Sequence, residues 1–184
     1  MKKLSKAALG VGVAAVAGLA ILPLTTYAST TEDVLITATI NSTLTLSVTN
    51  DTVNLGVLTP GGAPSTGSTT ANVVTNNLTG YNLNIRATTA ADVNLRDGAT
   101  RTIPALGAVG ALNAVATTSA WGFRIDAAPD FRGVTAADFA IKTTSTTTTS
   151  TGDNTLITFG AYARDGQAAG NYSASVTLTA VANL

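Results

Sequence analysis

Apolar and polar residues alternate in phase along residues 34–48. The even positions are apolar apart from Ser42, and the odd positions after Leu35 are all Thr, Asn or Ser. A helix would scatter the even positions around its axis, whereas a strand places them on one face. The pattern therefore predicts a β-strand. Its inward apolar side chains are Val34, Ile36, Ala38, Ile40, Leu44, Leu46 and Val48.

This predicted strand is much longer than ordinary strands, which average about five or six residues. At about 3.3 Å per residue, residues 34–48 would span roughly 50 Å. Two arrangements fit such a segment. It bends at Asn41-Ser42 and serves two sheets of its own domain, or it extends past that domain and completes the sheet of a neighbouring copy. In the second arrangement the inward residues form an assembly strand.

The period of two recurs along much of the chain, between stretches rich in turn residues. The segments with this period are residues 53–57, 81–87, 121–126 and 172–182, and residues 69–75 and 155–164 are further predicted strands. Several short alternating runs separated by turn signals are typical of antiparallel all-β domains. The chain is therefore expected to form an all-β fold, an antiparallel β-sandwich of the jelly-roll, immunoglobulin-like or pilin-like kind.

Four stretches depart from this pattern. Residues 76–80 have the composition of a hairpin-type loop, and the Thr-rich residues 143–153 that of an exposed loop. Residues 135–139 are the one place where we expect a helical turn. Residues 89–120 are irregular and rich in Ala, Gly and Leu, so they predict no regular element.

The first 28 residues have the features of a secretory signal peptide. Lys2, Lys3 and Lys6 precede the apolar run 7–24, and Ala28 would end the signal. The alternative, a retained membrane anchor, agrees less well with the weak hydrophobicity of this run. We therefore expect export to the cell surface or the extracellular space, and a single domain over residues 29–184.

Charge and composition exclude several classes of function. Loss of three signal lysines leaves seven of the ten basic residues against ten acidic residues, a net charge of −3, which argues against a nucleic-acid partner. The chain has neither cysteine nor histidine, so thiolate metal sites and Ser-His-Asp or Cys-His catalysis are impossible. We expect no enzyme activity, no cofactor and no membrane contact after signal removal.

The remaining candidates for chemistry have plain structural interpretations. Asp126 and Asp130 could act as a glycosidase pair, but their spacing is common among turn carboxylates that cap backbone amides. Lys142 is the one lysine outside the signal that could form a Lys–Asn cross-link, which also needs a buried acid. Trp121 could stack on a sugar, but its alternation with Phe123 predicts a core residue.

Three segments resemble exported all-β surface domains of bacteria. They are "TLTLSVTNDTVNLGVLTPGG" at 43–62, "WGFRID" at 121–126 and "AGNYSASVTLTAVANL" at 169–184. The nearest families are the WxL-type cell-wall-binding domains and the pilin-like sandwiches. The resemblance implies a sandwich fold and a cell-wall partner. The chain lacks the Trp-x-Leu signature near the C-terminus, and it lacks the cysteine pair of chaperone-assembled pilins.

These observations predict a non-enzymatic structural protein of the bacterial surface, such as a subunit of a pilus-like fibre or a surface layer. Its partner would be a second copy, bound by strand complementation through residues 34–48. We also expect no sortase signal or tail helix after the last strand, so that polymerisation or wall binding would keep the protein at the surface. The alternative is an adhesin or a carbohydrate- or cell-wall-binding module that uses residues 89–120 or 143–151.

Overall fold

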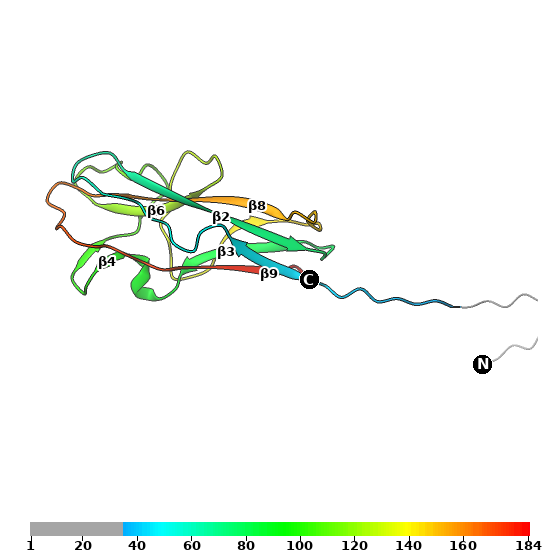
Figure 1. Ribbon diagram of the computed structural model, residues 1–184. Coiled ribbons are helices and arrows are strands. Elements are labelled where there is room, and N and C mark those ends of the chain that lie inside the picture. Colours follow the sequence, from blue (N-terminus) through cyan, green and yellow to red (C-terminus); the bar gives the residue numbers. More distant parts are fainter. Residues whose placement is uncertain (1–34) are drawn as a thin grey trace, which may run out of the picture. The chain divides into compact units, whose positions relative to one another are not determined.

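Residues 35–184 are described by the computed structural model (Figure 1), and the predicted signal peptide lies outside them. This part of the chain contains nine strands and one 3-10 turn. In chain order the elements are β1 (Leu44–Val48), β2 (Ser65–Thr75), β3 (Tyr81–Ala87), η1 (Ala90–Val93), β4 (Leu95–Asp97), β5 (Arg101–Ile103), β6 (Ala120–Ile125), β7 (Phe139–Thr143), β8 (Asp153–Tyr162) and β9 (Val176–Ala182). No helix in residues 35–184 has the length and hydropathy needed to cross a bilayer.

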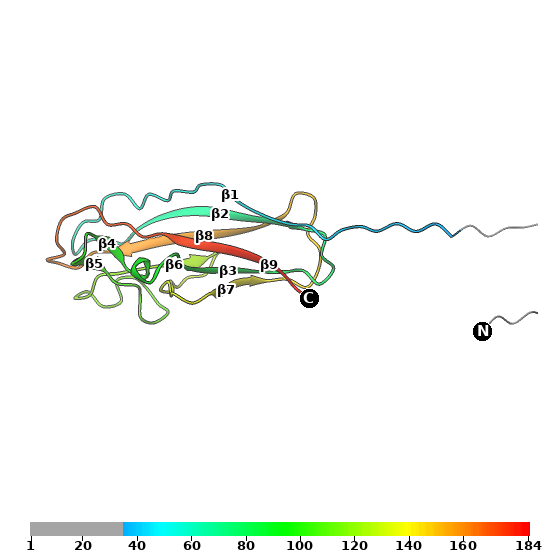
Figure 2. The same cartoon turned by 90° about the horizontal axis from the view of Figure 1, so that it is seen from below.

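The strands form two main antiparallel sheets that pack face to face. One sheet has four strands in the order β1-β2-β8-β6, and the other has three in the order β7-β3-β9. Figure 1 shows β2 and β8 in one layer and β3 and β9 in the other, and Figure 2 shows β9, β3 and β7 side by side. A small β4-β5 hairpin completes the fold. The predicted all-β antiparallel sandwich is confirmed.

The core lies between the two sheets and is centred on β3. All four odd-numbered side chains of β3, from Tyr81 to Ala87, are buried, because alternate residues of a strand share one face. Trp121 of β6 belongs to this core, as its alternation predicts, and its indole Nε1 donates to the carbonyl of Val93 at 2.9 Å. The core therefore depends on the same two-residue period that is visible in the sequence.

The predicted hairpin at residues 76–80 is wrong. β2 pairs with β1 and β8, whereas β3 pairs with β7 and β9, so this loop crosses from one sheet to the other. The Asn77 side chain donates to the carbonyls of Gly80 and Asn183, which fixes the crossing against the end of β9. The turn residues predicted a loop here, but they could not predict that the loop connects two different sheets.

The predicted helical turn at residues 135–139 is also wrong. Phe139 begins β7, and the carbonyl of Thr135 accepts a hydrogen bond from Ala87 N–H at 2.8 Å, so the segment follows the end of β3. The single helical turn of the described residues is instead η1, in the stretch expected to be irregular. Its Asp92 carboxylate accepts from the backbone and hydroxyl of Thr89, a capping arrangement that lowers the pKa of Asp92.

The alternating segment 34–48 forms a strand only over its second half. β1 begins at Leu44 because this residue is paired with Thr75, where β2 ends. Residues 35–43 belong to no strand, and the structure therefore does not contain the single bent strand between two sheets. Val34 lies outside the described residues.

Gly80 offers a test of the crossing between the sheets. Its φ of 78° is left-handed, and a Cβ there would meet the backbone carbonyl of Thr144. Gly98, in the β4-β5 turn, has a φ of 70° but open space around it. We expect Gly98→Ala to cost about 1–2 kcal/mol through its backbone conformation alone, and Gly80→Ala to cost about 1–3 kcal/mol more through overpacking.

Urea unfolding of the two glycine variants measures both free energies of unfolding. Equal losses in the two variants would contradict the close approach of the crossing loop to Thr144.

Candidate functional site

The two lateral edges of the sandwich differ in how far they are covered. On one side, the outer edge of β6 is covered: Phe123 and Arg132 exchange two backbone hydrogen bonds of 2.8 and 2.7 Å. The guanidinium of Arg132 also lies 4.2 Å from the centre of the Phe139 ring, at the start of β7. The β6–β7 side of the sandwich is therefore closed by backbone pairing and by a cation–π contact.

The opposite side ends in two edge strands, β1 and β9. Each is hydrogen-bonded to one neighbour only, β1 to β2 and β9 to β3. The two strands nevertheless lie close to each other, one at the margin of each sheet. An edge strand presents unpaired N–H and C=O groups, which are a template for pairing with another chain.

The inward side chains on this side are only half-buried, although they pack against the core. They are Leu44 and Leu46 of β1, Val53, Leu55 and Leu58 of the following loop, and Ala174, Val176, Leu178 and Ala180 at β9. The neighbouring strand β3, in contrast, buries every inward side chain. The core is therefore incompletely covered along β1 and β9, and we call these two strands the open edge.

The described residues before β1 carry apolar side chains in water. We call residues 35–43 the N-terminal segment. Leu35, Ile36 and Ile40 are 88%, 86% and 87% exposed. Clustered apolar exposure of this kind marks an interaction surface more often than a scattered surface leucine does.

The inward positions predicted for the assembly strand thus fall into two groups. Ile36, Ala38 and Ile40 lie in the exposed N-terminal segment, whereas Leu44, Leu46 and Val48 lie in β1. Within β1 the first two are half-buried, and Val48 is 41% exposed. The half-burial of β9 was missed, because alternation is the same for a covered strand and for an uncovered one.

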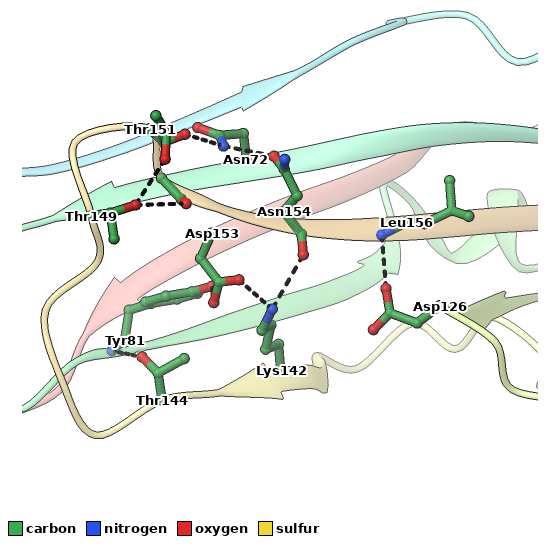
Figure 3. Close-up of polar contacts among 11 residues, drawn as sticks. Asn72, Tyr81, Asp126, Lys142, Thr144, Thr149, Thr151, Asp153, Asn154 and Leu156 are labelled. Carbon is green, nitrogen blue, oxygen red and sulfur yellow. Dashed lines mark hydrogen bonds and ion pairs between the residues drawn. The ribbon is translucent and has the colours of Figure 1, made fainter.

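A polar cluster near one end of the sandwich joins the two sheets (Figure 3). Lys142 of β7 lies with its Nζ 2.6 Å from Oδ1 of Asp153, the first residue of β8. The hydroxyl of Tyr81, at the start of β3, donates to Oδ2 of Asp153 at 2.8 Å. The Asp153 carboxylate therefore connects a strand of one sheet with two strands of the other.

Burial and hydrogen bonding oppose each other at this carboxyl group. Burial alone raises the pKa of Asp153, but the hydrogen bonds from Lys142 and Tyr81 outweigh it and hold the pKa below the ordinary value. For Tyr81, burial and the adjacent carboxylate both raise the pKa of the phenol. Asp153 is thus ionised and Tyr81 protonated at neutral pH.

This geometry is that of an ion pair and not of an amide cross-link. Amide formation needs a neutral amine, and a carboxylate ionised at neutral pH is a poor acceptor for it. The side-chain oxygen of Asn154 accepts from Asn72 at 2.7 Å, and Lys142 reaches only the backbone carbonyl of Asn154, at 3.3 Å. Figure 3 shows the Asn154 amide turned toward β2.

The other candidates for chemistry have structural roles. Oδ1 of Asp126 accepts the N–H of Leu156 at 3.1 Å, which is the capping role expected of a turn carboxylate, and Asp130 is exposed. Trp121 is buried and presents no face to a sugar. No group of three or more metal-ligating side chains occurs within residues 35–184.

The two irregular regions form the pockets. Residues within 104–120 line an apolar cavity of about 390 Å³, and the exposed Val109 and Val115 are part of this lining. A smaller hollow of about 210 Å³ lies in the Thr-rich loop, lined by residues 144–153. The hydroxyl of Thr148 receives the N–H of Thr75 at 2.9 Å, so this loop is joined to the end of β2.

No protein-family model, no curated protein and no solved structure matches this chain.

The Lys142–Asp153–Tyr81 cluster predicts a loss of stability in acid. A lowered pKa in the folded state contributes stability above the ordinary Asp pKa of about 3.9, and this stability is lost as the pH falls through the folded-state pKa. We expect Asp153→Asn to cost about 1–2 kcal/mol at pH 7 and to show less further loss below pH 4. Urea unfolding between pH 2 and 7 measures the difference, and parallel pH curves for the variant and the wild type would contradict it.

Tyr81 predicts the opposite dependence in base. Its raised pKa stabilises the folded state below the ordinary Tyr pKa of about 10, and the folded state loses this stability as the pH rises further. We expect Tyr81→Phe to be less stable at pH 7, because Asp153 loses a donor, yet to lose less stability above pH 10. Thermal unfolding at pH 7 and 11 tests this, and an equal decline in both proteins would argue against it.

Proposed function

We propose that this protein is a non-enzymatic structural subunit of a bacterial cell-surface assembly, such as a pilus-like fibre or a layer. One copy joins the next through its N-terminal segment, which adds as a strand to a sheet of the neighbouring copy. The observation that carries this proposal is the combination of an apolar, alternating and exposed segment with an open edge in the same chain. The exposed segment lacks a sheet to join, and the open edge lacks a strand to cover it.

The alternating side chains of the N-terminal segment favour strand addition over a loose contact. Main-chain hydrogen bonds would give affinity, and the side chains of Ile36, Ala38 and Ile40 would enter the partner's core. At about 25 cal/mol per Å², burial of one Ile contributes on the order of 2 kcal/mol. Two isoleucines and the backbone ladder would offset much of the entropic cost of association.

The secretory features of residues 1–28 and the resemblance to WxL-type and pilin-like surface domains support a location outside the cell. The scarcity of charge also fits a packed assembly, since residues 34–49 and 171–184 carry no charged side chain. Natural edge strands are often guarded by Lys or Pro, and neither guards these two segments.

A binding module is the second candidate function, and the apolar cavity at residues 104–120 favours it. Its lining is Ala, Gly, Leu, Val and Pro apart from Thr118 and Ser119, and it suits an apolar group better than a sugar, which needs several converging polar side chains. Binding to purified cell walls that is lost on Val109→Asp, in a chain that stays monomeric, would favour this alternative.

Charge substitutions in the N-terminal segment test the assembly proposal. In the chain that begins at Ser29, Ile36→Asp with Ile40→Asp changes the inward face, and Thr37→Asp with Thr39→Asp adds the same charge to the outward face. Loss of two buried isoleucines, about 4 kcal/mol in total, would weaken assembly by about 1,000-fold. We expect fibres or large oligomers from the wild type and from the threonine variant, and monomers from the isoleucine variant.

Analytical ultracentrifugation and electron microscopy give the readout, with circular dichroism to show that all three proteins fold. Monomers of the wild type at every concentration would overturn the proposal, as would undiminished assembly of the isoleucine variant.

A further inference from the structure

We infer that the acceptor of the N-terminal segment is the free edge of β9 in a second copy, where the segment becomes the fourth strand of the β7-β3-β9 sheet. This inference rests on the proposed function and adds to it the edge that is used. The two main sheets have four edge strands, β1, β6, β7 and β9, and the structure distinguishes between them.

The backbone of β9 is suited to receive a strand. Its ladder with β3 uses odd-numbered residues, since Ser175 accepts from Thr88 N–H and Asn183 donates to Gly80, each at 3.0 Å. Hydrogen bonding alternates along an antiparallel pair, so the even-numbered residues, Val176 to Ala182, direct their N–H and C=O groups away from β3. The N–H and C=O groups of these four residues form a free ladder along the seven-residue strand.

The same even-numbered residues also leave the core uncovered. Val176, Leu178 and Ala180 point toward the core and remain half-buried. Residues that lie opposite each other in adjacent strands place their side chains on the same face. A strand paired to β9 would thus direct Ile36 and Ile40 over these side chains, because both strands repeat their inward positions every two residues.

The other edges are less suitable. Residues around Phe123 and Arg132 already cover the outer edge of β6. On β7, Ile141 is 6% exposed, and the half-buried Phe139 already carries the Arg132 guanidinium over its ring, so an added strand would bury little more apolar surface there. Each strand on the closed side has one half-buried apolar side chain, Ile125 on β6 and Phe139 on β7, whereas β9 has three in a row along its free ladder.

The number of strands in each sheet separates β9 from β1. The sheet that contains β1 has four strands and the sheet that contains β9 has three. A strand added beyond β1 would give a five-stranded sheet opposite a three-stranded one, and the inward side chains of the added strand would stay in water. A strand added beyond β9 gives two four-stranded sheets that face each other. It also brings apolar side chains toward Leu44 and Leu46 of β1, which lies next to β9.

Cross-linking between single-cysteine variants tests this assignment, because the chain has no native cysteine. Thr39→Cys in the segment is mixed in turn with Thr179→Cys on β9, Thr45→Cys on β1 or Thr143→Cys on β7. All four are outward positions, and bismaleimides with spacers of increasing length link thiols on adjacent strands over a range of registers. We expect the product with Thr179→Cys to exceed the two others by at least tenfold.

Each outcome of the cross-linking decides between the two proposals. Assemblies that cross-link at Thr45→Cys or Thr143→Cys, or that give no Thr179→Cys product, would overturn the β9 acceptor and leave the assembly function standing. Absence of assemblies would overturn both. A Thr39→Cys/Thr179→Cys double variant that cross-links within single chains, and not between them, would show that the acceptor lies in the same copy.

Ala180→Pro tests the edge by a second route. The N–H of Ala180 points away from β3, so proline there removes a donor of the free ladder and keeps the bonds to β3. Ala180→Ser keeps the N–H and serves as the control. We expect both variants to fold, with assembly reduced at least tenfold in Ala180→Pro only; equal assembly of the two folded variants would contradict the β9 acceptor.

Discussion

The outermost strand of an antiparallel sheet leaves the N–H and C=O groups of every second residue unpaired, and in β9 the same residues carry the half-buried core side chains. The three-stranded sheet ends one strand before the four-stranded sheet that it faces. Apolar side chains on β9 and β1 are therefore half-buried, while those of β3 are fully covered. In the proposed assembly, one added strand would pair with the free backbone groups and cover the half-buried core side chains together, because both belong to the same alternate residues of β9.

The closed side of the sandwich shows how the chain covers an edge when it does so with its own residues. There Arg132 pairs with Phe123 through the backbone and places its guanidinium over Phe139. Toward one end of the sheets, Asp153 joins Lys142 and Tyr81 across both layers. With few charges available, the chain uses them to tie the sheets together and leaves the open edge uncharged, which suits pairing with another strand and not repulsion.

The sequence predicted the fold class and the core, because burial on one face imposes a period of two that is visible in Tyr81–Ala87 and around Trp121. It could not predict which strands pair, since alternation carries no information on neighbours; the loop at residues 76–80 was thus mistaken for a hairpin. It missed β7 because Phe139 follows an Ala-rich stretch that resembles a helical turn. The unusual length of the alternating residues 34–48 predicted an assembly strand, which stays a prediction. Nothing in the sequence around Val176 or Leu178 separates a half-covered strand from a buried one.

Hydrogen–deuterium exchange of the chain beginning at Ser29, compared between dilute and concentrated solution, tests the central claim most directly. The claim that one copy completes the sheet of the next predicts that alternate amides of residues 36–42 and those of Val176, Leu178 and Ala180 exchange rapidly when dilute and become protected together when concentrated. Rapid exchange of both groups at every concentration, or protection of one group without the other, would contradict it.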